Sequence, residues 1–130
     1  MSRRNIQHVF VYGTLMDPHI IKAVTGKRFE TRRAILYGYR KIDPPYSYPL
    51  LLPDPRHKVE GRLLLNVDAD SLKRLDDYED EGKLYQRCVV TVKTDDADME
   101  AFVYFGKPHM LLKTRDLRAI LIDIEIHDLF

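Results

Sequence analysis

The stretch VFVYGTL, residues 9–15, decides the fold. β-Branched and aromatic residues that stop at Gly13 indicate a buried strand ending in a tight loop. Because glycine has no Cβ, the backbone of such a loop can approach a ligand closely and direct consecutive N–H groups at one point. A cluster of N–H groups of this kind binds an anion, so the stretch predicts a carboxylate-binding loop. The alternative interpretation is a strand followed by an ordinary turn.

Length and composition indicate one globular domain over residues 1–130, because 45% of the residues are hydrophobic and 32% are charged. The net charge of +1 favours neither a nucleic-acid partner nor a membrane partner. No apolar run approaches the ~20 residues that span a bilayer, and the N-terminal run is too interrupted for a signal peptide. The single cysteine, Cys88, cannot form an internal disulfide, so we expect a soluble cytoplasmic protein.

Two short helices are predicted. Asp17 followed by Pro18 is typical of a helix start, and Gly26 is typical of its end. A second helix is predicted over residues 68–77, with Asp70 as a possible cap.

Apolar runs and alternating patterns predict strands over residues 34–42, 59–67, 85–93 and 99–105. Gly61 lies inside one of them, which suggests a bulge or the close approach of another group. A short apolar run at 50–52 is expected to end in a turn at 53–55, which contains two prolines. For the C-terminal segment we favour a helix followed by a strand at 122–126. The predicted class is α+β, a mixed sheet that curls into a small β-barrel flanked by short helices.

The stretch LDDYEDE, residues 75–81, holds five carboxylates at the expected C-terminal end of the second helix, where they oppose the helix dipole. A solvated acidic face is one explanation. Alternatively, neighbouring Leu75 and Tyr78 remove water from a carboxylate and raise its pKa towards the range of a general base. If the helix ends here, Glu79 is the acid best placed to turn inward.

Two residues of the following strand could serve the same site. The hydroxyl of Tyr85 could contact a substrate or Glu79, and Arg87 could neutralise the acidic cluster. Both residue types are also ordinary in these positions, because tyrosine is frequent in strands and arginine commonly pairs with surface acids.

The segments VFVYGTLM, YPLLL, VEGRLL, LDDYE and LYQR, in this order over residues 9–105, resemble the gamma-glutamylcyclotransferase-like family. The resemblance is closest to the gamma-glutamylamine cyclotransferase branch. It implies a small mixed β-barrel with helices at its side and a cavity at the YGTL loop. It also implies that Tyr12, Gly13, Thr14 and Leu15 bind the α-carboxylate end of a γ-glutamyl group, and that Glu79 is the catalytic residue.

The implied reaction is intramolecular aminolysis of a small γ-glutamyl amide, which releases 5-oxoproline and a free amine. It needs neither a metal nor an organic cofactor, and the five histidines show no metal-ligand spacing. The pocket for the leaving amine is expected from Tyr46, Tyr48, Pro49 and the C-terminal segment.

Two other functions stay open at this point. One is a non-catalytic module that binds a small molecule on the same fold. The other is a structural protein that dimerises through an exposed strand at 122–126. We therefore expect a monomer or a homodimer.

Overall fold

The computed structural model describes residues 6–42 and 49–107. The expected helix and strand of the C-terminal segment lie outside these residues, as do Tyr46 and Tyr48. Within the described part, no helix is long and apolar enough to cross a membrane.

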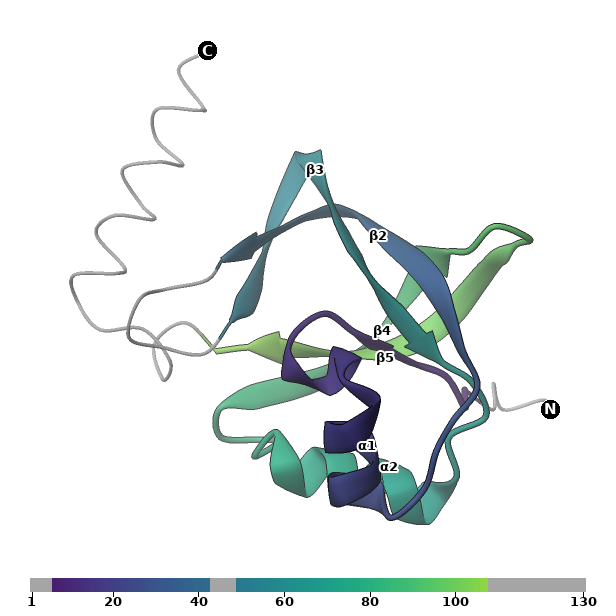
Figure 1. The fold of residues 1–130 in the computed structure, drawn as a ribbon. Helices are drawn as coiled ribbons and strands as arrows, with labels where there is room; N and C mark the ends of the chain where they lie inside the picture. The colour runs from purple at the N-terminus through teal and green to yellow at the C-terminus, as the bar shows by residue number, and fades with distance from the viewer. Residues whose placement is uncertain (1–5, 43–48, 108–130) are drawn as a thin grey trace, which may run out of the picture.

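Five strands form a closed barrel in the order β1-β3-β2-β4-β5 (Figure 1). The strands are β1 (Val9–Val11), β2 (Thr31–Ile42), β3 (Leu50–Leu64), β4 (Tyr85–Lys93) and β5 (Asp98–Gly106). Two helices, α1 (Pro18–Thr25) and α2 (Ala69–Tyr78), contact each other at one side of the barrel. The predicted α+β class and small mixed barrel are confirmed.

Strand pairing explains why the sheet is mixed. Two long antiparallel pairs, β2 with β3 and β4 with β5, join strands that follow each other in the chain. The short strand β1 lies between them, antiparallel to β3 and parallel to β5, where Val9 is opposite Phe102. Strand β1 therefore closes the barrel, although it is only 3 residues long.

The turn expected at residues 53–55 is wrong, because β3 runs through this segment without ending. Tyr37 on β2 pairs with Lys58, whereas Tyr39 pairs with Pro53. The intervening residues 54–57 therefore lie opposite Gly38 alone, which has a φ of 86°. Prolines are tolerated at such an irregularity because the ladder is already interrupted there.

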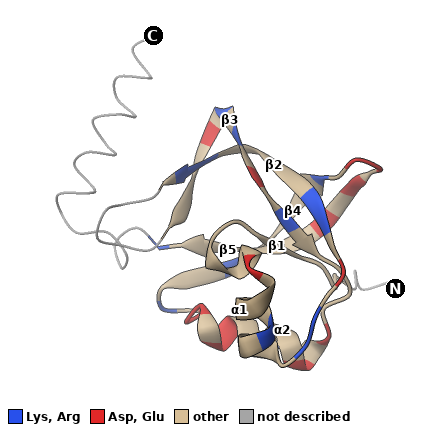
Figure 2. Ribbon diagram, viewed as in Figure 1, with Lys and Arg blue, Asp and Glu red and all other residues tan. Residues whose placement is uncertain are grey.

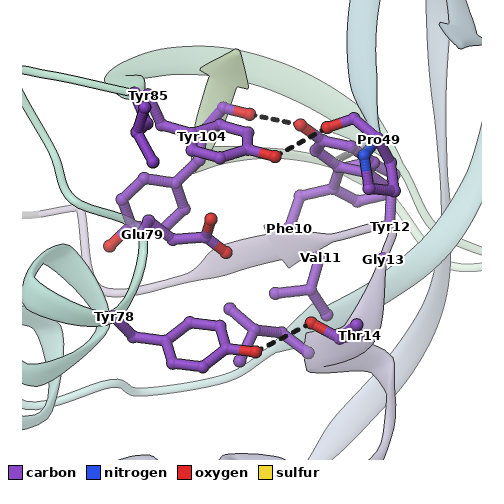
Figure 3. A pocket seen from close by; sticks show the side chains of 12 residues that line it. Phe10, Val11, Tyr12, Gly13, Thr14, Pro49, Tyr78, Glu79, Tyr85 and Tyr104 are labelled. Atoms are coloured by element: carbon purple, nitrogen blue, oxygen red, sulfur yellow. Dashed lines mark hydrogen bonds between the residues drawn. The ribbon is translucent and has the colours of Figure 1, made fainter. Parts of the chain in front are cut away.

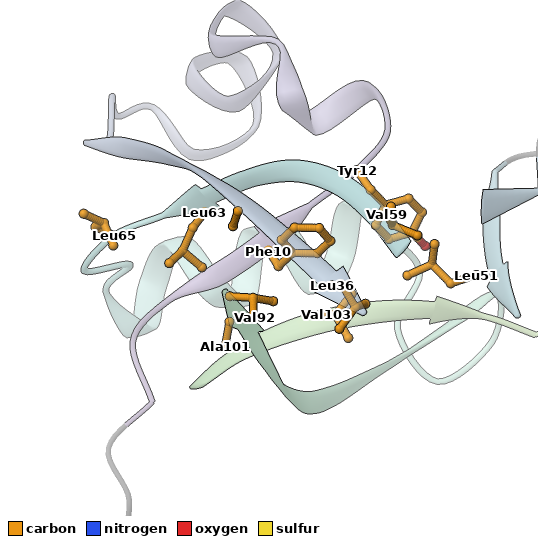
Figure 4. Close-up of a cluster of buried hydrophobic side chains, with 11 residues drawn as sticks. Phe10, Tyr12, Leu36, Leu51, Val59, Leu63, Leu65, Val92, Ala101 and Val103 are labelled. Carbon is orange, nitrogen blue, oxygen red and sulfur yellow. The ribbon is translucent and has the colours of Figure 1, made fainter. Parts of the chain in front are cut away.

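Strand β1 sends its side chains to both faces of the barrel wall. Phe10 is fully buried in a cluster inside the barrel that includes Leu36, Leu63 and Val103 (Figure 4). The neighbouring Val9 and Val11 belong to a second core cluster. Its helical members include Leu15 of the YGTL loop, Ile21 of α1 and Leu75 of α2.

Gly61 of β3 lets this core form. A Cβ at Gly61 would lie 2.7 Å from Cζ of Phe10 and would also clash with the carbonyl oxygen of Val11. The close approach that the sequence suggests at this glycine is confirmed.

The ends of α2 direct the chain towards the barrel. Asp68, rather than the predicted Asp70, caps the helix, because its carboxylate accepts a hydrogen bond from the Ser71 N–H. At the other end, Glu79 is the C-cap residue and still has helical φ and ψ. Asp80 then adopts a positive φ of 51°, so the chain reverses immediately after Glu79.

Candidate active site

A cavity opens where β1 ends. Beyond Val11 the strand leaves the sheet, whereas β5 continues, and the Tyr12 hydroxyl donates a 2.5 Å hydrogen bond to the carbonyl oxygen of Tyr104. The Tyr12 side chain thus makes the cross-strand bond that a backbone N–H would make if β1 continued. A cavity of about 220 Å³ lies beside the Tyr12 side chain (Figure 3). Its lining residues are Phe10, Val11, Tyr12, Gly13, Thr14, Leu15, Pro49, Tyr78, Glu79, Leu84, Tyr85 and Tyr104.

The YGTL loop forms one wall of this cavity. Residues Thr14–Met16 make a single 3-10 turn, and the Met16 N–H donates to the carbonyl oxygen of Gly13 at 3.0 Å. The first N–H groups of such a turn have no partner within it. Among the described residues, the N–H groups of Thr14 and Leu15 donate to no backbone acceptor. The loop is therefore both a turn and a source of N–H groups at the cavity.

Glu79 brings a carboxylate into the same cavity (Figure 3). Burial raises its pKa from 4.5 to about 7. Its carboxylate makes no hydrogen bond or ion pair with any residue that the structure describes. A carboxylate with a pKa near neutrality can both accept and return a proton, which is what a general acid–base residue must do. The cavity thus contains one ionisable group suited to proton transfer.

Figure 2 colours the acidic positions of the ribbon red, and the other four acids of the 75–81 stretch have surroundings different from those of Glu79. Asp77, Asp80 and Glu81 are exposed, as the solvated-face interpretation expects. Asp76 is half-buried and pairs with Arg87 at 2.7 Å, so the expected neutralisation of the acidic cluster by this arginine is confirmed. Of the five, only Glu79 lies in the cavity.

Tyr85 lines the cavity, but its hydroxyl is used within the protein. It donates a 2.7 Å hydrogen bond to the carbonyl oxygen of Pro49. The hydroxyl hydrogen is thus directed to Pro49 rather than to Glu79, which corrects one of the contacts considered from the sequence. This bond joins β4 to the start of β3 and holds the Pro49 wall of the cavity in place.

Sequence reasoning missed two tyrosines of the site. Tyr78 was expected only to shield Glu79 from water, but its hydroxyl lies 3.0 Å from the Thr14 hydroxyl and joins the end of α2 to the YGTL loop. Tyr104 is almost fully buried and forms part of the cavity wall. An aromatic residue is ordinary in a strand, so no local signal distinguishes it.

A barrel whose small cavity holds a half-buried carboxylate that pairs with no described residue defines a small-molecule site with a candidate proton-transfer residue. A family model described as gamma-glutamyl cyclotransferase, AIG2-like, matches residues 9–122. The chain therefore belongs to this family.

Similar proteins agree with the assignment. AIG2-like protein C of Arabidopsis thaliana is 30% identical over 112 residues, which are 82% of this chain and 64% of the relative. AIG2-like protein A of the same organism is 32% identical over 92 residues, which are 70% of this chain and 54% of that relative. This chain thus spans less than two thirds of either. The solution structure of another Arabidopsis thaliana protein, 26% identical, superposes with a TM-score of 0.69 over 99% of this chain and 93% of that one.

Proposed function

We propose that this domain is a γ-glutamyl cyclotransferase that cleaves a γ-glutamyl amide by intramolecular aminolysis, releasing 5-oxoproline and a free amine. The observation that carries the proposal is the carboxylate of Glu79, which pairs with none of the described residues and shares one cavity with the YGTL loop. Membership of the gamma-glutamyl cyclotransferase, AIG2-like family supports it.

The binding step would use both walls of the cavity. The N–H groups of Thr14 and Leu15 would hold the α-carboxylate of the substrate, which brings its α-ammonium group towards Glu79. A volume of about 220 Å³ is below the roughly 300–1,000 Å³ of pockets for drug-sized ligands. The cavity therefore suits the glutamyl half of the substrate, with the amine half directed outward. We propose a γ-glutamylamine, such as one formed with the ε-amine of lysine, as the first substrate to test.

The chemical step needs one proton carrier. Glu79 takes a proton from the α-ammonium group, and the freed nitrogen attacks the γ-carbonyl carbon to close a five-membered ring. The bond from that carbon to the amide nitrogen then breaks, and Glu79 passes its proton to the departing amine. The regenerated carboxylate takes the second proton from the ring nitrogen, which leaves a neutral lactam, and passes this proton to the amine, which departs as an ammonium ion. Holding a cyclising conformer can supply up to ~7–11 kcal/mol, and proton transfer by Glu79 adds about 10²–10⁴-fold.

Neighbouring tyrosines stay neutral during this cycle. Burial is the main reason why the pKa values of Tyr12 and Tyr104 lie well above 10. The negative charge of Glu79 raises them further. Both residues therefore act as uncharged walls of the cavity, and the proton that moves belongs to Glu79.

The test is the release of 5-oxoproline from a panel of γ-glutamyl compounds, measured by mass spectrometry. The panel contains γ-glutamyl-ε-lysine, γ-glutamyl amino acids and glutathione. Glu79→Gln should abolish release because it keeps the shape and removes the basic oxygen. Asp77→Asn, the matched control, alters an exposed acid of the same helix and should retain release.

A second function is favoured by the same carboxylate, which could bind a substrate ammonium group without any reaction. Binding of the panel compounds is measured by calorimetry. If the wild type binds a compound without releasing 5-oxoproline and Glu79→Gln does not bind it, the domain is a binding module. Wild-type release retained in Glu79→Gln would instead show that another acid is the base.

A further inference from the structure

Behind the cavity, Asp76 joins three elements of the fold. One of its carboxylate oxygens accepts a 2.7 Å hydrogen bond from the Tyr104 hydroxyl of β5. The other oxygen accepts a 2.7 Å charged hydrogen bond from Arg87 of β4. The side chains of Asp76 and Arg87 are only 24% and 28% exposed, so water screens this pair less than a surface pair.

Arg87 also contacts Phe102 and Glu81. Its guanidinium carbon lies 4.6 Å from the ring centroid of Phe102, which is a favourable cation–π distance. Its backbone N–H donates to the carboxylate of Glu81 at 3.3 Å. The Phe102 ring therefore helps to hold the cation beside Asp76, and the Glu81 bond fixes the backbone that carries it.

The Asp76 contacts also fix the turn that carries Glu79. Glu79 follows Asp76 by three residues and keeps helical φ and ψ, so the two Cβ atoms are expected about 5–6 Å apart. The backbone carbonyl oxygen of Asp76 accepts a 2.9 Å hydrogen bond from the Glu81 N–H. Tyr104, which binds the Asp76 carboxylate, also lines the cavity that Glu79 enters.

We infer that Asp76 and Arg87 are positioning residues for Glu79: their ion pair holds the helix end that carries Glu79, and keeps the charge of Arg87 compensated so that Arg87 does not act as a counter-ion for Glu79. The catalytic part of this inference rests on the proposed cyclotransferase function. The electrostatic part concerns the free protein and can be tested without a substrate.

The groups that surround Glu79 come from four elements. They are the tyrosines that line the cavity with it: Tyr12 of the loop after β1, Tyr78 of α2, Tyr85 of β4 and Tyr104 of β5. Asp76 and Arg87 do not line the cavity, but Asp76 binds both Arg87 and the Tyr104 hydroxyl. The tyrosine side chains end in uncharged hydroxyl groups, whereas Asp76 and Arg87 carry opposite charges that compensate each other. Removing one member of the pair leaves the charge of the other facing the helix end.

The two single substitutions should therefore move the titration of Glu79 in opposite directions. Asp76→Asn leaves the positive charge of Arg87 without its partner. This charge favours the ionised form of Glu79 and should lower the half-titration pH of Glu79 by about one unit. Arg87→Met leaves the negative charge of Asp76 without its partner, and this charge should raise the half-titration pH of Glu79 by about the same amount. The measurement is an NMR titration of the Glu79 side-chain carboxyl carbon, assigned by its loss in Glu79→Gln.

Three controls separate charge from structure. Tyr104→Phe removes a hydrogen bond to Asp76 without changing any charge, and should move the titration far less than either charge substitution. Arg87→Lys keeps the charge, and the double variant Asp76→Asn/Arg87→Met removes both charges. These two variants should titrate close to the wild type. If one single variant does not fold, the direction of the shift in the other still tests the inference.

Opposite shifts would support the inference. Shifts in one common direction, or changes below about 0.3 unit in both single variants, would overturn it. With a reacting substrate, the acidic limb of the kcat/KM profile should move in the same directions as the titration. If the titration moves as expected but no panel compound yields 5-oxoproline, the proposed function fails while the electrostatic role of the pair stands.

Discussion

Glu79 should lower the stability of the folded protein at neutral and alkaline pH, and Glu79→Gln should remove this effect. The pKa of Glu79 is about 7 in the folded protein against 4.5 for an unperturbed glutamate. Between these two values the folded state binds more protons at this residue than the unfolded state does. The free energy of unfolding therefore falls as the pH rises through this window.

The size of the effect follows from the two pKa values. The cost of ionising Glu79 in its cavity is about 1 kcal/mol at pH 5 and reaches at most about 3 kcal/mol at pH 8.5. Because glutamine cannot ionise, Glu79→Gln should exceed the wild type in stability by these amounts. With urea m-values of about 1–3 kcal/mol/M, the difference at pH 8.5 corresponds to a midpoint shift of about 1–3 M.

The assay is urea unfolding of the wild type and Glu79→Gln at several pH values between 5 and 8.5. Titrations that occur in both proteins cancel in the difference between them. The matched control is Glu60→Gln, which makes the same chemical change at an exposed position on β3. A difference between Glu79→Gln and the wild type that does not grow with pH would refute the reasoning. An equal growth in Glu60→Gln would refute it as well.

Two glycines should respond to alanine in opposite ways. Gly61→Ala should destabilise the protein by about 1–3 kcal/mol or more in urea unfolding, because the new Cβ would lie 2.7 Å from the buried Phe10 ring. Unchanged stability would contradict the close packing of β1 on β3. Gly13→Ala should leave the stability nearly unchanged, because the nearest atom to its Cβ is Cγ of Pro49 at 3.9 Å. It should nevertheless raise KM about tenfold, since the methyl group stands in the cavity wall; an unchanged KM would show that the loop does not bind the substrate carboxylate.

Features that depend on short stretches of chain could be predicted from the sequence. The start of α1 is set by Asp17 and Pro18, and its end by Gly26, which has a φ of 77°. The inward position of Glu79 is also local, because it depends on where α2 ends. What the sequence could not show is that Asp80 takes a left-handed conformation and reverses the chain directly after it.

Features that depend on distant partners could not be predicted. The two prolines at 53–55 indicate a turn by themselves, but β3 continues because β2 contributes Gly38 at the matching position. The parallel contact between β1 and β5 joins opposite ends of the described chain. The bond between Tyr104 and Asp76 likewise links a strand to a helix end, and neither residue's local pattern indicates the other.

The arrangement of charges at the end of α2 favours the enzyme over the binding module. A site that only holds an ammonium ion benefits from a carboxylate that is always ionised, which a nearby arginine would ensure. Arg87 lies close enough to neutralise an acid of this stretch, yet it pairs with Asp76. Glu79 is instead left in the cavity with a pKa of about 7, where loss and gain of a proton are both accessible near neutral pH. A residue that must take a proton from one nitrogen and return it to another needs this property, whereas a permanent counter-ion does not.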